Sequence, residues 1–176
     1  MAIVQTELYL IRHGIAAERG TYANDGDRPL TAKGIQRTET MVKRLGALGC
    51  RFDAVLTSPL VRAQQTADIL VRLGLASTLE TFGALAPGGQ LHDWLSWLEW
   101  WQGHSAQGRV ALVGHEPDLS DWGQRLVTGQ GGDRWVLKKA GVIGLMVPAA
   151  EVALGQSELF WLSSPRLLLG QGLTFG

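Results

Sequence analysis

The chain has 176 residues, 45% of them hydrophobic, which is the size of one domain with enough apolar side chains for a sizeable core. Sixteen basic and sixteen acidic residues give no net charge, so no global field would attract nucleic acid or an anionic membrane. Any site for an anion must therefore be local. No stretch approaches the about 20 apolar residues of a membrane helix, and the single Cys50 cannot form an intramolecular disulfide, which favours a cytoplasmic protein.

An apolar run at 8–14, LYLIRHG, stops abruptly at Arg12, His13 and Gly14. The run predicts a buried strand rather than an export signal, and the glycine marks where the backbone leaves the sheet. Arginine offers a fork of donors that fits a phosphate or carboxylate, and histidine can be a neutral nucleophile near pH 7. An isolated tripeptide of this kind is more often a solvated strand end, so the interpretation depends on the segments downstream.

Beyond a polar loop at 15–29, apolar strands alternate with amphipathic helices. Strands are predicted at 52–57, 79–82, 109–114, 142–147 and 159–162. Helices are predicted at 32–48, 59–73, 91–101 and 117–128. Thr31 and Ser58 have the hydroxyl of an N-cap, and Pro59 suits a first helical position. The last two strands indicate a hairpin at a sheet edge.

This alternation predicts a single domain over residues 1–176, a three-layer α/β/α sandwich whose mostly parallel sheet has an antiparallel edge and helices on both faces. We expect Ile35 on the buried face of the first helix and Trp94 on the packed stripe of the third, with Trp100 off that stripe and exposed. The tail at 165–176 has no assignment.

Three of the predicted strands end in groups suited to an anion, namely Arg12 with His13, Ser58 with Arg62, and His115. The carboxyl ends of parallel strands meet at one edge of a sheet, so residues about a hundred positions apart can come together there. Arg62 lies in the first turn of its predicted helix, whose amino end also favours an anion through its dipole. The sequence thus predicts two guanidinium groups and two imidazoles around one phosphoryl group.

The order and spacing of these residues resemble those of the histidine phosphatase superfamily, which also contains cofactor-dependent phosphoglycerate mutases. The resemblance covers residues 8 to about 126 and lies in Arg-His-Gly at 12–14, Ser-Pro-x-x-Arg-Ala-x-Gln-Thr-Ala at 58–67 and Gly-His at 114–115. The chain is most similar to the short SixA-type phosphohistidine phosphatases, through DRPLTAKG at 27–34, VGHEPDLS at 113–120 and Lys139. This resemblance implies a phosphoglycerate mutase-like fold and a phosphatase enzyme.

In the mechanism that the resemblance implies, His13 attacks phosphorus and forms a phosphohistidine, which water then hydrolyses. The residues expected to hold the equatorial oxygens are Arg12, Arg62 and His115, and those expected at the rim are Ser58, Glu116 and Lys139. No metal or other cofactor is expected. His13 must begin neutral, whereas His115 would help most as an imidazolium, and the adjacent Glu116 could set that difference.

Larger members of the superfamily use a Glu or Asp to protonate an alkoxide leaving group, and the segment 79–94 offers only Glu80 and Asp93, neither convincing. A histidine nitrogen, with a pKa of about 6.5, needs far less help than an alkoxide at about 15 to 16. We therefore expect a phosphohistidine-bearing protein as substrate, for example a histidine phosphotransfer domain in signal transduction, with neither nucleic acid nor membrane as partner. The alternatives are a small-molecule phosphomonoesterase or phosphoglycerate mutase-like enzyme, and a non-catalytic phosphate-binding module.

The remaining polar residues have simpler interpretations. His92 and His104 have no partners at metal-ligand spacing, so we expect surface or capping roles for them. Lys138, beside Lys139, could be one of a solvated pair. Arg19 and Arg28 lie in the first loop, where a solvated charge is the common case, although contact with a protein substrate stays open.

Overall fold

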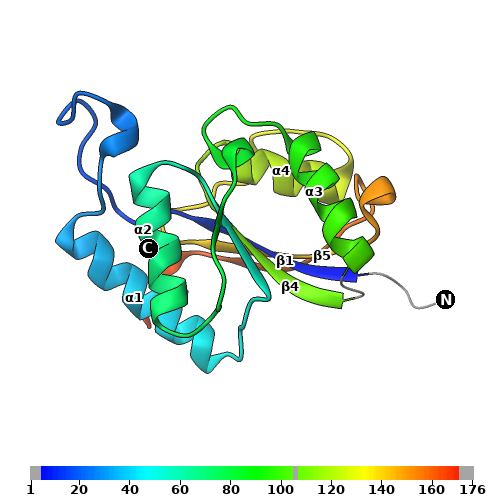
Figure 1. Cartoon of the computed structure of the whole chain (residues 1–176), viewed down its shortest axis with the longest axis horizontal. Helices are drawn as coiled ribbons and strands as arrows, with labels where there is room; N and C mark the ends of the chain where they lie inside the picture. The colour runs from blue at the N-terminus through cyan, green and yellow to red at the C-terminus, as the bar shows by residue number, and fades with distance from the viewer. Residues whose placement is uncertain (1–4, 105–106, 171–176) are drawn as a thin grey trace, which may run out of the picture.

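The computed structural model describes residues 5–104 and 107–170, along which strands and helices alternate (Figure 1). The strands are β1 (Gln5–Arg12), β2 (Ala54–Thr57), β3 (Glu80–Thr81), β4 (Gln107–Gly114), β5 (Val142–Val147) and β6 (Glu158–Ser163). The α-helices are α1 (Ala32–Ala47), α2 (Val61–Arg72), α3 (Leu91–His104), α4 (Asp118–Thr128) and α5 (Pro165–Leu168). The connections contain the short 3₁₀ helices η1 (Asp25–Asp27), η2 (Gly83–Leu85) and η3 (Ala150–Val152).

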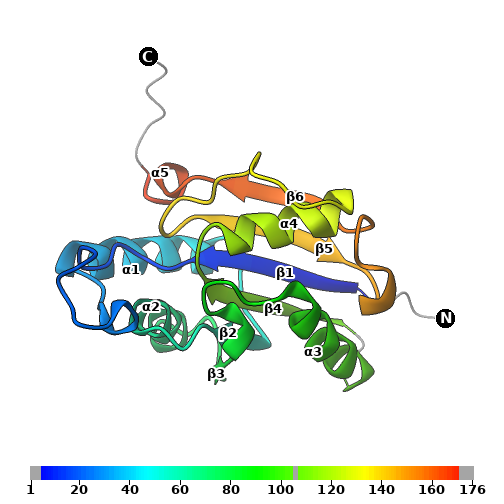
Figure 2. The ribbon, with the colours of Figure 1, turned by 90° about the horizontal axis from the view of Figure 1, so that it is seen from above.

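The sheet has the strand order β3-β2-β4-β1-β5-β6, so β1 lies between β4 and β5 (Figure 2). β1 pairs in parallel with β4, β4 with β2, and β2 with β3, whereas β5 pairs antiparallel with both β1 and β6. Parallel neighbours need a long crossover, and α1, α2 and α3 lie in the connections between the parallel strands. The predicted mostly parallel sheet with an antiparallel edge is confirmed.

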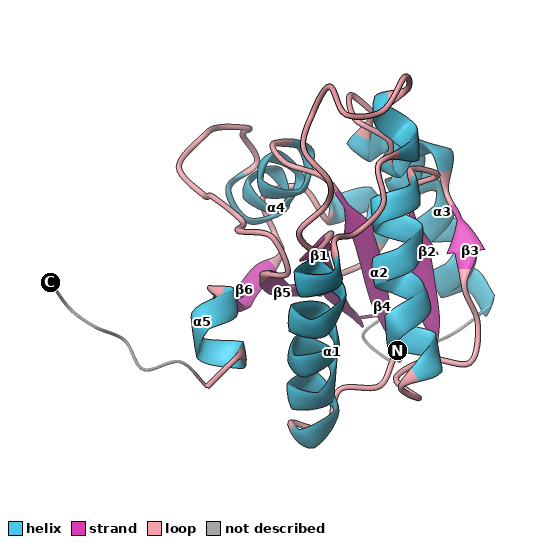
Figure 3. Ribbon diagram, turned by 90° about the vertical axis from the view of Figure 1, so that its left-hand side faces the viewer, coloured by secondary structure: helices cyan, strands magenta, loops and turns pink. Residues whose placement is uncertain are grey.

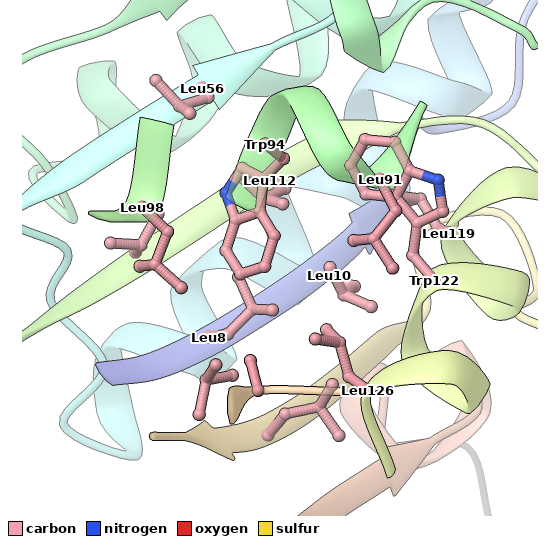
Figure 4. Packing of buried hydrophobic residues seen from close by; sticks show 14 of the residues in the cluster. Leu8, Leu10, Leu56, Leu91, Trp94, Leu98, Leu112, Leu119, Trp122 and Leu126 are labelled. Carbon is pink, nitrogen blue, oxygen red and sulfur yellow. The ribbon is translucent and has the colours of Figure 1, made fainter. Parts of the chain in front are cut away.

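Side chains of the sheet divide between two apolar layers, because successive residues of a strand point to opposite faces. Leu8 and Leu10 of β1 join a cluster that contains Trp94 of α3 and the buried leucines of α4 (Figure 4). Tyr9 and Ile11 belong to the second cluster, with buried side chains of α1 and α2, which lie side by side (Figure 3). Burial on both faces explains why β1 and β4 are almost continuously apolar.

Several local predictions are confirmed at the level of single residues. Thr31 caps α1, since its side chain accepts a hydrogen bond from the Gly34 N–H at 3.0 Å. Trp94 is fully buried, and Trp100, off the packed stripe of α3, is 58% exposed. The periodicity of apolar residues therefore identifies which face of α3 packs on the sheet.

Two local predictions are wrong. Ile35 is 38% exposed, because the buried face of α1 runs along residues that begin with Gly34 and Thr38. α2 begins at Val61 rather than at Pro59. Its N-cap residue is Leu60, so the Ser58 side chain is not the cap of this helix. A serine before a proline satisfies the local rule for a helix start, but this serine has a tertiary partner, described below.

The segment after β6, which has no assignment from sequence, begins with α5, and Leu168 of this helix is buried in the same cluster as α1 and α2. The rest of that tail, at 171–176, lies outside the described residues, as do residues 1–4.

Candidate active site

The four residues predicted to surround a phosphoryl group lie together at the carboxyl edge of the parallel strands. Arg12 is the last residue of β1 and His13 follows it, while His115 directly follows β4. The register pairs Arg12 with Gly114, so these two strands end level with each other. Arg62 is the second residue of α2, the helix after β2, and β2 pairs with β4. All four side chains line one pocket of about 480 Å³.

The His13 ring has a fixed orientation. Its Nδ1 lies 2.7 Å from the Gly14 carbonyl oxygen and must donate there, because a carbonyl oxygen only accepts. In the neutral ring the lone pair is therefore on Nε2. The Gly14 N–H donates to Thr66 Oγ1 at 3.0 Å, which ties the turn after β1 to α2. A buried imidazole whose Nδ1 is already engaged has its free lone pair on Nε2.

Close packing requires a glycine at position 14. A Cβ atom there would collide with Thr38 Oγ1 of α1 and would lie 3.2 Å from the Leu30 side chain. The Arg-His-Gly motif thus combines two functional side chains with a residue that lets α1 approach the end of β1.

His115 lies beside His13, with ring centroids 5.1 Å apart and ring planes inclined by 54°. Its Nε2 shares a hydrogen bond of 2.7 Å with Ser58 Oγ. Ser58, expected at the rim, is fully buried, and besides this bond to His115 its Oγ accepts a longer one, of 3.3 Å, from the Leu60 N–H just before α2. Nδ1 of His115 is buried and has no hydrogen-bond partner among the described residues. Ser58 therefore orients the ring and leaves its second nitrogen for a ligand.

The protein engages only some of the donors of the two arginines. Arg12 Nη1 donates to the Leu137 carbonyl oxygen at 2.9 Å. Arg62 donates through Nη1 to the Asp25 backbone oxygen at 2.8 Å and through Nη2 to the Asp25 carboxylate at 3.0 Å. The Nε atoms of both arginines are buried and unpaired within the described part of the chain. Buried polar atoms normally have a hydrogen-bond partner. A tetrahedral anion in the pocket would accept hydrogen bonds from the two Nε atoms and from His115 Nδ1.

Asp25 and Arg28, from the loop after β1, also line this pocket, although neither is among the predicted site residues. Arg28 is only 7% exposed, so the expectation of a solvated loop charge is wrong. It donates to Asp25 Oδ1 at 2.7 Å and to the Ala17 carbonyl oxygen at 2.6 Å. Asp25 bridges Arg28 and Arg62, and the hydrogen bond from Arg28, with the charges of both arginines, lowers the pKa of the Asp25 carboxyl. The signal in the sequence was the segment DGDRP at 25–29, in which two acids precede the arginine and a proline follows it.

The surrounding protein keeps both imidazoles neutral near pH 7. Burial lowers the pKa of His13 to about 3, with smaller contributions in the same direction from His115, Arg62 and Arg12. Burial and the same two arginines lower the pKa of His115 to about 4, and the acid that opposes them is Asp25 rather than Glu116. The neutral His13 agrees with the expectation, whereas the neutral His115 contradicts the imidazolium expected there. A bound phosphoryl dianion would raise the pKa of His115, because opposite charge favours the protonated form.

Glu116 and Lys139 also line the pocket. Glu116 is half-buried and accepts hydrogen bonds from Ser120 Oγ at 2.7 and 2.6 Å, and burial raises the pKa of its carboxyl. Loss of solvation, followed by the charges of nearby arginines, lowers the pKa of the exposed Lys139 ammonium. Glu80, in β3, and Asp93, in α3, do not line the pocket, so the segment searched from sequence supplies no acid to it.

Residues outside the pocket have the simpler roles expected of them. His104 Nδ1 lies 2.7 Å from the Trp100 carbonyl oxygen at the end of α3, and His92 lies on the exposed side of the same helix. Among residues 5–104 and 107–170, no group of three or more His, Cys, Asp or Glu side chains could hold a metal ion. No helix within those ranges is long and apolar enough to cross a membrane.

Known proteins resemble the chain in both sequence and fold. The model of the histidine phosphatase superfamily (branch 1) matches residues 8–82. A protein of Picosynechococcus sp., described as uncharacterized, is 50% identical over 164 residues, which cover 93% of this chain and 99% of the relative. Identity at this level over nearly the whole length of both chains shows a common family.

Two solved structures show the same fold. The protein histidine phosphatase SixA, complexed with tungstate, has a TM-score of 0.80 and 24% identity over 92% of this chain and 99% of its own. A putative α-ribazole-5′-phosphate phosphatase from Escherichia coli has a TM-score of 0.72 and 20% identity over 91% of this chain and 97% of its own. The predicted α/β/α fold and the predicted phosphatase family are confirmed. The chain therefore belongs to the histidine phosphatase superfamily (branch 1) and is, at the level of that family, a phosphatase.

Proposed function

We propose that this protein is a phosphohistidine phosphatase, which removes phosphate from a phosphohistidine-bearing protein through a covalent intermediate on His13. The observation that carries the proposal is that His13, whose Nε2 is free, lines one pocket with Arg12, Arg62 and His115, each of which has a buried nitrogen without a partner among the described residues. One domain, formed by residues 1–176, would carry this activity. We further propose a cytoplasmic role in signal transduction, with a histidine phosphotransfer domain as a suitable substrate.

The reaction has two displacements at phosphorus. In the first, the lone pair of His13 Nε2 forms a bond to phosphorus while the bond from phosphorus to the substrate imidazole breaks, and that imidazole leaves with the electron pair. In the second, a water oxygen attacks the phosphorus of phospho-His13, the bond from phosphorus to Nε2 breaks and its electron pair returns to the ring, one water proton passes to solvent, and free His13 and hydrogen phosphate result. Arg12, Arg62 and His115 hold the equatorial oxygens in both steps, which is where most of the catalysis in phosphoryl transfer arises.

The state of Asp25 in the pocket favours a leaving group that needs little protonation. Asp25 lies between two arginines that lower the pKa of its carboxyl, so it is a poor proton donor near pH 7. A histidine leaving nitrogen has a pKa of about 6.5, against about 15 to 16 for an alkoxide, so a phosphohistidine needs the weaker acid assistance. The SixA structure that the chain resembles is named for a protein histidine phosphatase.

A phosphomonoester substrate is the second candidate, and Glu116 is the observation that favours it. This carboxyl lines the pocket, and burial raises its pKa, which is the direction required of a general acid. A phosphomonoesterase or phosphoglycerate mutase-like enzyme would need such an acid to expel its alkoxide. The α-ribazole-5′-phosphate phosphatase that shares the fold is named for a substrate of this class.

The test compares purified wild-type protein, His13→Ala and the control His92→Ala on a phosphohistidine-bearing protein and on phosphate monoesters. We expect preferential hydrolysis of the phosphohistidine, a loss of about a thousandfold or more in His13→Ala, and no change in His92→Ala. Acid-quenched labelling would capture phosphate on His13. Faster turnover of monoesters, reduced by Glu116→Gln, would support the second candidate instead. Binding of phosphate without any turnover would indicate a non-catalytic module, and equal turnover by His13→Ala would refute the nucleophile.

A further inference from the structure

A second pocket, of about 630 Å³, adjoins the catalytic pocket. The two pockets share Arg12 and Lys139 in their walls. Beyond these two residues, its wall comes from the loop after β1, from α1, from the segment before β5 and from α5. We call this pocket the basic groove, after its five cationic lining residues Arg12, Arg37, Lys138, Lys139 and Arg166.

The basic groove concentrates positive charge in a chain that has no net charge. None of its eight lining residues is acidic. Among the described residues, Arg37, Lys138 and Arg166 form no ion pair, whereas Arg28 and Arg62 in the catalytic pocket are both paired with Asp25. Like charges gathered without counter-charges repel one another, so an anionic ligand would lower the energy of this surface.

We propose that the basic groove binds an acidic segment of the phosphohistidine-bearing substrate protein, close to the phosphohistidine itself. This inference rests on the proposed function and adds to it a sequence preference in the substrate. Because Arg12 and Lys139 lie at both pockets, a peptide whose phosphohistidine contacts His13 continues over these two cations into the groove.

The rest of the lining suits a peptide. Ile15 and Pro165 add apolar surface against which the carbon stems of Asp and Glu side chains can pack. The eight lining residues include no aromatic side chain on which a nucleic-acid base would stack. Charge complementarity of this kind acts mainly on encounter and affinity, so the groove determines KM rather than kcat.

The test uses two fluorescent, unphosphorylated peptides that differ only in the residues beside one histidine: four Asp and Glu residues in the first, and Gln and Asn in the second. Anisotropy measures their binding to wild-type protein and to the triple variant Arg37→Glu, Lys138→Glu, Arg166→Glu. A control triple variant, Lys43→Glu, Arg44→Glu, Arg134→Glu, makes the same change in net charge at exposed residues that do not line the groove. Hydrolysis of both peptides in phosphohistidine form, and of free phosphohistidine, is measured in parallel.

We expect wild-type protein to bind the acidic peptide about tenfold more tightly than the neutral one, with the difference falling as salt is added. The groove variant loses this preference and shows about a tenfold higher KM for the acidic phosphopeptide, while its kcat and its turnover of free phosphohistidine are unchanged. Equal binding of the two peptides, or the same loss in the control variant, would overturn the inference. Selective binding of the acidic peptide without hydrolysis of any phosphohistidine would refute the proposed function alone.

Discussion

Acidification should destabilise this protein through the two histidines of the pocket. In the unfolded chain each imidazole titrates near its ordinary pKa of about 6.5. In the folded protein the pKa is about 3 for His13 and about 4 for His115, and both rings are buried. The unfolded chain therefore binds more protons between these values. The stability contributed by neutral rings is complete above about pH 6.5 and is lost as the pH falls towards 3 to 4.

The magnitude at pH 5 follows from this difference. The folded rings are still mostly unprotonated there, while an unfolded imidazole gains RT ln(1 + 10^1.5), which is about 2 kcal/mol. Each histidine thus lowers the free energy of unfolding by about 2 kcal/mol between pH 8 and pH 5. Replacement of His13 by Gln removes one of these contributions, so the variant should lose about 2 kcal/mol less than wild type over the same change in pH.

Urea unfolding followed by tryptophan fluorescence measures this at pH 8 and pH 5 for wild type, His13→Gln and His115→Gln. The exposed His92 of α3 supplies the control variant His92→Gln, which should lose as much stability as wild type. Carboxylates also contribute to the pH dependence, but they do so equally in all four proteins, so the comparison isolates the imidazoles. A wild-type pH dependence in His13→Gln would refute the neutral, buried His13 from which the nucleophile is argued.

Three further predictions concern single side chains of the pocket. Gly14→Ala places a methyl group against a threonine hydroxyl of α1, so urea unfolding should show a loss of about 1–3 kcal/mol, and kcat should fall with it. Ser58→Ala removes the hydrogen bond that orients His115, and kinetics should show kcat about tenfold lower with little change in KM, whereas Ser58→Thr restores most of it. Asp25→Asn removes the carboxylate charge that Arg62 contacts, so calorimetry should show inorganic phosphate binding several-fold more tightly; weaker binding would mean that Asp25 mainly orders the arginines.

The main architecture could be predicted because it depends on local patterns. Apolar runs followed by polar residues predicted β1, β2 and β4 and located their carboxyl ends, where Arg12, Ser58 and His115 lie. In a parallel sheet these ends share one edge whatever the details of packing, so the four central residues could be grouped before any coordinates. Apolar periodicity likewise identified the buried face of α3.

Three wrong predictions, for Ser58, Arg28 and His115, concern interactions and burial that only folding creates. Ser58 has the local sequence of an N-cap, yet its hydroxyl bonds to His115, which lies 57 residues away. Arg28 has the local sequence of a solvated loop, yet Asp25 and a carbonyl of the same loop bury it beside Arg62. Burial is the main reason why the pKa of His115 is lowered, and the charges that add to it are those of Arg62 and Arg12 rather than that of the adjacent Glu116.

The sequence by itself therefore determined the order of strands and helices along the chain and which side chains gather at the edge of the sheet, because these follow from local composition and spacing, and its motifs carried the resemblance to the family. Only the tertiary structure decided the direction of the free His13 nitrogen, the protonation of both imidazoles, the Asp25 bridge between two arginines, and the basic groove beside the pocket. These features depend on burial, and on the Coulomb and hydrogen-bonding interactions of groups that only folding brings within a few ångströms of one another.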